Sequence, residues 1–294
     1  MQILTSIKPL ALIINAFVTD SDSVHALFDS EYTNRHALLT TSQLEMLKNS
    51  DLVFFITQDF KVFLTKSQHQ EVIDQSKLVS LGNMSGLRLL RVRRSGQMPH
   101  VIHNQYENRF EQKQGVFNQR FNNGIDWHIW LNPDNAILIA MKVRDELTKI
   151  DPNKEVIYQQ RFEEFRQELL DLNAKISKKM MQSLGQPFFV LHDRLQYFEE
   201  QFGIEAKGII LENRQLNLSA HQLLKLRKVM HQFDVRKVVK AAADSNFAID
   251  KLETGDPFEI IEIDSLARDD FAHFLTFHEY FAATADKFLK ALSQ

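Results

Sequence analysis

The chain has 294 residues, about twice the length of an average domain, so two domains are expected. It is 44% hydrophobic and 25% charged, which excludes wholesale disorder, and its net charge of −3 provides no basic field that would attract nucleic acid. Cysteine is absent, and this excludes disulfides, thiolate metal ligands and cysteine nucleophiles.

Motifs for membranes and for the common enzyme classes are also missing. No apolar run approaches the ~20 residues that a membrane-spanning helix requires, so direct insertion into a membrane is not expected. The sequence contains no glycine-rich phosphate-binding motif, no GxSxG and no HExxH. Its first residues lack a basic region followed by an apolar segment, so we expect either a cytoplasmic protein or one whose leader has been removed.

The first half of the chain alternates short apolar runs with amphipathic segments. In chain order we predict a strand at 3–7, helices at 10–18 and 41–49, a strand at 52–56, a helix at 60–68 and a strand at 77–81. Strands and helices that alternate at this spacing predict a parallel sheet. Residues 88–123 interrupt the alternation, because they are polar and show no clear period, and we interpret them as a long loop.

The second half repeats the same plan after one long helix. Residues 155–183 contain no glycine or proline and carry apolar side chains at helical spacing, which predicts a helix long enough to bridge two domains. The remaining predicted elements are a helix at 136–150, strands at 188–191, 209–211, 238–239 and 260–263, and helices at 195–202, 220–233 and 269–292.

These patterns predict an α/β fold class. The chain would contain two parallel-sheet domains of similar plan joined by one long helix. The predicted parts are an N-terminal domain over 1–150 that includes the loop 88–123, a linking helix over 153–183 and a C-terminal domain over 184–294.

Two histidines lie where an α/β fold places its ligands. A metal site without cysteine must use imidazole and carboxylate, which suit zinc or manganese. His128 follows Asp126 and lies between the only two tryptophans, whereas His192 ends a predicted strand and precedes Asp193. A histidine at the carboxyl end of a strand in each half fits a site between two domains. The alternatives are a His128 that is only packed by aromatic rings and an Asp193 that caps a helix.

The segments around these histidines resemble a known family. Residues 188–193, with 197–198 and 202–204, resemble the F-x-V-x-H-D-A-F-x-Y-F-x-x-x-F-G-L block of metal-specific solute-binding proteins. Residues 126–133 resemble the D-x-H-x-W-L-S/D-P block of that family, and residues 5–10 are similar to the S-I-x-P-L opening of its ZnuA-type members. These proteins are the receptors of zinc or manganese ABC importers, and the resemblance implies a metal cleft between the two domains.

The first ligand of the family pattern, E-H-x-Y/F-x-x-x-P-S, does not align cleanly. Counting back from Ser42 places the ligand column on Arg35, with His36 one residue later, whereas matching residues 30–31 places it on Tyr32. We choose His36, because a loop absorbs a slip of one residue. Arg35 would instead bring a fixed positive charge that opposes a cation.

The resemblance implies a metal site made of His36, His128 and His192, with Asp264 or water as the fourth ligand. Asp264 lies in a segment that resembles the family's x-L-D-P-L, and its alternative roles are a helix cap or a surface charge. A zinc hydrolase would need a general base, for which only Asp193 and Asp264 are candidates, neither of them in an activating motif.

From the resemblance we expect a binding protein and not an enzyme. It would be an extracytoplasmic or periplasmic monomer that captures Zn²⁺, with Mn²⁺ as the second choice. It would deliver the metal to the membrane permease of an ABC importer. Because protons compete for imidazole, binding should weaken below the ordinary histidine pKa of about 6.5.

A second hypothesis is a divergent paralogue that keeps the fold, binds metal weakly or not at all, and acts as an interaction protein. It is motivated by Arg35, and by Lys240–Ala243, which stand where the family has a cleft-lining glutamate. It is also motivated by the loop 88–123, which holds only His100 and His103 where zinc receptors carry a His/Asp-rich loop. We interpret this loop as a solvated insertion, with an auxiliary metal-binding pair of its two histidines as the alternative.

Overall fold

We describe the protein from a computed structural model. The residues that it describes are 1–19, 21–28, 39–57, 60, 74–93, 124–183, 185–211, 217–241, 244–253, 255, 257–268 and 273–293. The predicted helix at 60–68 lies outside them except for Phe60, and so does the part of the predicted loop from 94 to 123.

The elements of the first half are β1 (Gln2–Ile7), α1 (Lys8–Asn15), β2 (Ser23–Phe28), α2 (Thr41–Asn49), β3 (Leu52–Phe55), β4 (Leu78–Ser80), β5 (Leu90–Arg91), β6 (Ile125–Asp126) and α4 (Pro133–Ile150). The long helix α5 (Glu155–Ser183) follows. The second half comprises β7 (Phe188–Val190), α6 (Gln196–Phe202), β8 (Gly208–Ile209), α7 (Ala220–Phe233), β9 (Lys237–Lys240), α8 (Phe247–Asp250), β10 (Glu259–Glu262) and α9 (Phe277–Leu292).

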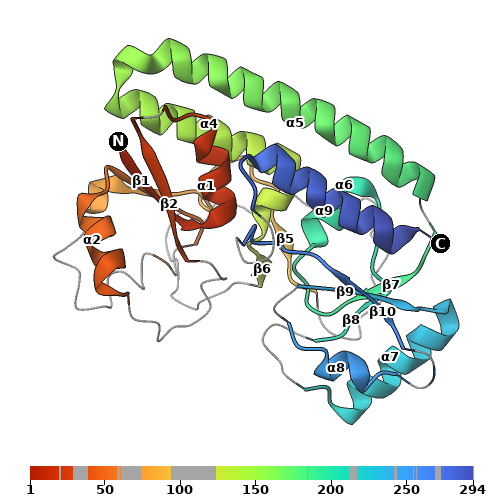
Figure 1. The fold of residues 1–294 in the computed structure, drawn as a ribbon. Helices are drawn as coiled ribbons and strands as arrows, with labels where there is room; N and C mark the ends of the chain where they lie inside the picture. Colours follow the sequence, from red (N-terminus) through yellow and green to blue (C-terminus); the bar gives the residue numbers. More distant parts are fainter. Residues whose placement is uncertain are drawn as a thin grey trace.

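Each half contains one parallel sheet, and the two sheets have the same strand order. The first is ordered β2-β1-β3-β4, and the second, read from its other edge, is β8-β7-β9-β10. In both, the first strand of the half therefore pairs with the second on one side and the third on the other. Helix α5 runs above both sheets and packs against α4 and α9 (Figure 1). The predicted α/β fold with two parallel sheets and one long joining helix is confirmed.

Several elements differ from the sequence prediction: β5 and α8 were not predicted, and two other differences have a clear physical reason. Strand β2 was not predicted, because it lies at the edge of the first sheet and only one of its six residues, Leu27, is buried. The closing helix begins at Phe277 and not at 269, because Thr276 and Glu279 form a capping box that satisfies the first backbone N–H groups.

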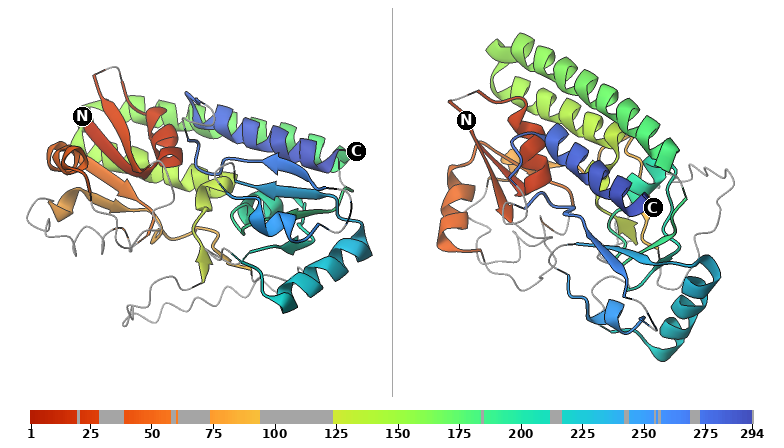
Figure 2. Two further views of the ribbon diagram at one scale, coloured as in Figure 1. Left: turned by 60° about the horizontal axis from the view of Figure 1, so that its bottom comes forward. Right: turned by 45° about the vertical axis from the view of Figure 1, so that its right-hand side comes forward.

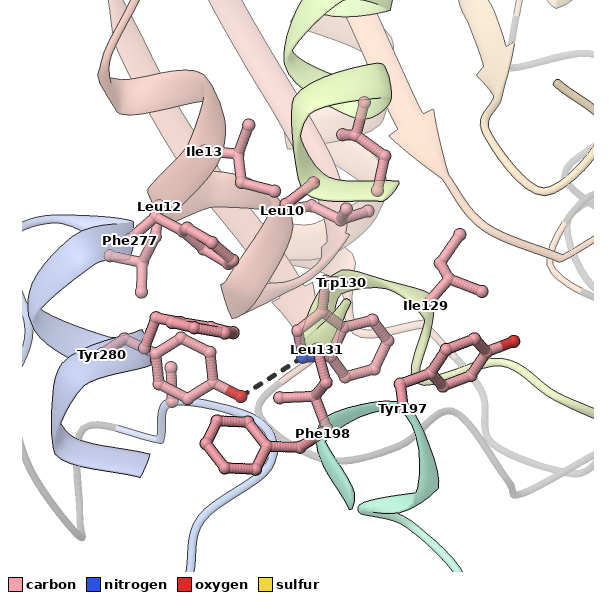
Figure 3. Packing of buried hydrophobic residues seen from close by; sticks show 14 of the residues in the cluster. Leu10, Leu12, Ile13, Ile129, Trp130, Leu131, Tyr197, Phe198, Phe277 and Tyr280 are labelled. Carbon is pink, nitrogen blue, oxygen red and sulfur yellow. Dashed lines mark hydrogen bonds between the residues drawn. The ribbon is translucent and has the colours of Figure 1, made fainter. Parts of the chain in front are cut away.

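One continuous hydrophobic core extends through both halves. It joins α1 and β3 of the first half to β7, α6 and α9 of the second. Figure 3 shows its centre, where Trp130 lies between the aromatic side chains of α9 and α6 and its indole Nε1 donates to the hydroxyl of Tyr280 at 3.2 Å. The predicted boundaries between the domains stay a prediction, since this core crosses them.

Candidate metal site

His128 is held by an acidic neighbour from its own segment. Its Nδ1 lies 2.6 Å from Oδ1 of Asp126, and the same oxygen accepts the backbone N–H of His128 at 3.0 Å. The Asp126 side chain is 1% exposed, and that of His128 is 12% exposed. Because a carboxylate only accepts hydrogen bonds, Nδ1 carries the proton, and Nε2 is the nitrogen suited to a metal.

The segment that carries His128 lies at the carboxyl end of the first sheet but does not belong to that sheet. Its strand β6 pairs antiparallel with β5 in a separate two-stranded ribbon. Gly82, just beyond β4, allows Trp127, which follows β6, to lie close to the end of the first sheet. A Cβ at this position would come within 2.4 Å of the carbonyl oxygen of Ile56 and 2.9 Å of the ring of Trp127.

His192 is held by an acidic residue from another strand. Its Nδ1 lies 3.0 Å from Oδ2 of Asp244, which follows β9, the neighbour of β7 in the sheet. Burial acts to raise the pKa of Asp244, but the hydrogen bond with His192 and the charge of Arg194 outweigh it and lower the pKa. The pair therefore lies between the first and third strands of its half, at the carboxyl end where parallel sheets bind ligands.

Asp244 is a functional candidate that the sequence analysis missed. The segment Lys240–Ala243 indicated only the loss of a supporting glutamate, but the next residue supplies the carboxylate that contacts His192. The sequence alone carries no signal for it, because only the pairing of β7 with β9 in the folded sheet brings their carboxyl ends together.

Asp193 does not cap a helix, which was the alternative role that the sequence suggested for it. Helix α6 has Leu195 at its N-cap, and the carboxylate of Asp193 instead accepts hydrogen bonds from Arg93, with distances of 2.9 Å from Nε and 2.6 Å from Nη2. Burial raises the pKa of Asp193 to about 6 against the opposing charge of Arg93. This ion pair also contradicts a fully solvated insertion, because Arg93 belongs to the described start of the loop 88–123 and is 20% exposed.

Asp264 organises the turn after β10. Its carboxylate accepts the backbone N–H groups of Leu266, at 3.0 Å, and of Arg268, and it lies 3.6 Å from the Arg268 guanidinium. With its side chain 5% exposed, it is neither a helix cap nor a surface charge. A role as metal ligand would add to these contacts and stays a prediction.

A hydrogen bond across the core joins the His128 segment to the turn after β10. Trp130, two residues after His128, donates from Nε1 to the carbonyl oxygen of Ser265 at 3.0 Å. Ser265 in turn lines a small open hollow together with His192 and Asp244. Arg194 and Lys240 also line this hollow, so two positive charges lie beside His192.

The structure describes only part of the ligand set that the sequence predicts. His36 lies outside the described residues, as do its alternatives Arg35 and Tyr32 and the loop histidines His100 and His103. Within the described part of the chain, no three histidine or acidic side chains gather closely enough to hold a metal ion. The structure thus places His128 and His192 each beside a carboxylate, and the complete ligand set stays a prediction.

Comparisons with known proteins agree with this architecture. The family model of ZnuA, described as "Zinc-uptake complex component A periplasmic", matches residues 3–291. The high-affinity zinc uptake system protein ZnuA of Haemophilus ducreyi is 22% identical over 293 residues, which cover 100% of this chain and 94% of that protein. The protein of the same name from Brucella abortus is 24% identical over 223 residues, with 71% and 66% covered.

Solved structures show the same fold. A crystal structure of ZnuA superposes with a TM-score of 0.74 at 20% identity and covers 100% of this chain and 99% of that one. A laminin-binding adhesin (Lmb) mutant from Streptococcus agalactiae gives a TM-score of 0.75 at 16% identity, with both chains fully covered. Among the described helices, none combines the length and apolar character needed to cross a bilayer. The chain therefore belongs to the ZnuA family, the periplasmic metal-binding proteins of ABC importers, which are binding proteins and not enzymes.

Proposed function

We propose that this protein captures Zn²⁺ with His128 and His192 in the region between its two sheets. His36 and Asp264, or a water in place of Asp264, would complete the coordination. As a monomer it would then deliver the metal to the membrane permease of its importer. The proposal follows the names of the relatives, which are zinc uptake proteins, and extends them to particular residues of this chain.

The observation that carries the proposal is the repeated pairing of imidazole with carboxylate. Nδ1 of His128 and Nδ1 of His192 each lie within 3.0 Å of an aspartate oxygen. Metal-binding histidines use this arrangement, because the carboxylate fixes the tautomer, orients the ring and makes the other nitrogen a stronger ligand.

Zinc is favoured over manganese by the donor types. Imidazole suits zinc, whereas manganese favours carboxylate and water oxygens. The one carboxylate in the proposed set, Asp264, already accepts two backbone N–H groups and faces Arg268, so its charge is partly satisfied. We therefore expect Mn²⁺ to bind more weakly than Zn²⁺.

Calorimetric titration of metal-stripped protein with Zn²⁺ tests the proposal. We expect submicromolar affinity that is lost in the double variant His128→Ala, His192→Ala. The matched control is His221→Ala, His231→Ala, because both residues are exposed on α7, at the far end of the second half from the first sheet (Figure 2). Equal affinity of the two double variants would refute the proposed ligands. The pair His36→Ala and Tyr32→Phe then identifies the first ligand, since only loss of a true ligand weakens binding, whereas Arg35→Ala would strengthen binding if its fixed positive charge opposes the cation.

A second candidate function is that of an interaction protein that binds metal weakly or not at all. The hollow beside His192 favours it, because the two cationic side chains of Arg194 and Lys240 outnumber the one carboxylate, Asp244, that lines it, and like charge repels a cation. The same titration separates the two: neither heat nor a thermal shift with Zn²⁺ would support the interaction protein.

A further inference from the structure

A short segment of the first half is fastened to one helix of the second. We call residues 88–93 the strap. Four of its residues contact a single stretch of the second half, residues 193–200. Arg88 forms an ion pair with Glu200, the backbone N–H of Leu90 donates to the hydroxyl of Tyr197 at 3.0 Å, the carbonyl of Arg91 accepts from Gln196 at 2.8 Å, and Arg93 binds Asp193 and Glu199.

The contact of Arg93 is the buried one. Its guanidinium donates to Asp193 and, through Nη1 and Nη2, to both oxygens of Glu199 at 2.8 Å, and its backbone N–H donates to Asp193 at 2.6 Å. The Asp193 and Glu199 side chains are 2% and 3% exposed. Moving Arg93 away would leave the carboxylates of Asp193 and Glu199 buried without a positive charge. This cost keeps the guanidinium in place.

The stretch 193–202, which ends in α6, contacts both histidine segments. Asp193 follows His192 directly in the bend after β7, so Arg93 fixes the backbone next to that histidine. Tyr197 of α6, whose pKa is raised by burial, donates its hydroxyl proton at 2.7 Å to the carbonyl of Asp126, the partner of His128. The strap and α6 therefore set the position of one histidine segment relative to the other.

We propose that Arg93 is a positioning residue for metal capture. It touches no metal, but it fixes the separation and angle at which the two histidine segments meet, so that the site is set before the metal arrives. This inference rests on the proposed zinc function. A purely structural Arg93 would change stability alone, whereas a positioning Arg93 changes the geometry and affinity of the bound metal in a protein that remains folded.

The test compares Arg93→Gln with Arg236→Gln, an exposed arginine of the second half that pairs with Asp234. Each full-length protein is stripped of metal and titrated with Zn²⁺ and separately with Co²⁺, whose visible spectrum reports ligand geometry. We expect Arg93→Gln to weaken Zn²⁺ binding about tenfold or more and to alter the Co²⁺ spectrum at saturation. The control should stay within about twofold of the unaltered protein. Arg93→Lys keeps the charge without the forked geometry and should recover only part of the loss.

Two further outcomes keep the test decisive. Should Arg93→Gln fail to fold, the triple variant Arg93→Gln, Asp193→Asn, Glu199→Gln removes all three charges together and leaves none unpaired. The inference predicts weak binding and an altered spectrum in this variant also. Native affinity and an unchanged Co²⁺ spectrum in any folded variant that lacks the guanidinium would overturn the role of Arg93. Absence of metal binding by the unaltered protein would instead overturn the proposed function.

Discussion

The two histidine–aspartate pairs reach the same arrangement by different routes. Asp126 precedes His128 by two residues, so one short segment supplies both the ring and its partner. His192 and Asp244 are 52 residues apart and meet only because β7 and β9 are neighbours in the second sheet. The first pair therefore depends on a local turn, and the second depends on the folded sheet.

The pairs also differ in burial and in the competition for the carboxylate. The Asp126 side chain is 1% exposed, and its Oδ2 is buried with no hydrogen-bond partner among the residues that the structure describes. That of Asp244 is 15% exposed, and its Oδ1 faces Arg194 at 3.5 Å. Asp126 thus directs its charge to one histidine in a poorly solvated place, whereas Asp244 divides its charge between His192 and the guanidinium of Arg194. We expect the first pair to contribute more to metal affinity.

The largest effect is therefore expected at Asp126. Asp126→Asn retains an oxygen for the ring and the backbone N–H of His128 but loses the negative charge that makes the imidazole a stronger ligand. We expect Zn²⁺ affinity to fall about 10- to 100-fold, toward the upper part of that range, with little change in the thermal midpoint. Calorimetry and thermal unfolding measure the two quantities on one sample. An affinity unchanged within error would show that the first pair is only structural.

A smaller loss is expected at Asp244. Asp244→Asn should weaken Zn²⁺ binding about tenfold, because Arg194 already withdraws part of the carboxylate's charge from His192. Titrating this variant beside Asp126→Asn gives the ratio of the two losses. A greater loss at Asp244 would reverse the ranking and indicate that solvation matters less than distance from the metal.

The sequence predicts the contacts between residues that are near each other in the chain, but not the contacts between distant residues. The D-x-H spacing places Asp126 beside His128 in any compact turn, and the helical periodicity of 155–183 predicts α5 with both of its ends. Asp244 could not be predicted in this way, because nothing in the sequence states that β9 lies next to β7. The ion pair of Arg93 with Asp193, which joins residues 100 apart, escaped prediction for the same reason.

The lowered pKa of Asp244 gives a third, smaller effect, on stability. A carboxylate whose pKa is lower in the folded protein stabilises it at pH values above the unfolded pKa of about 3.9, and this stabilisation is lost as the pH falls through the lower folded pKa. At pH 7 we expect the free energy of unfolding of the metal-free protein to be about 1 kcal/mol larger than that of the Asp244→Asn variant. Urea titrations at a series of pH values should show the difference shrinking as the pH falls through the lowered pKa of Asp244. Asp234→Asn, on the surface, serves as the control, and a difference that does not depend on pH would exclude this origin.

The smallest expected effect has the opposite sign and makes the two pairs alike. Arg194→Gln removes the positive charge that shares Asp244 and lines the hollow beside His192, whereas the 3.0 Å contact between His192 and Asp244 stays. We expect Zn²⁺ affinity to rise about two- to fivefold, the scale of a partly exposed ion pair. In this background Asp244 serves one histidine, as Asp126 does, so Asp244→Asn should then cost more than it does alone. A double-mutant cycle measures this coupling directly. If Arg194→Gln lowers the affinity instead, the guanidinium serves mainly to orient Asp244, and competition for charge does not explain why the pairs differ.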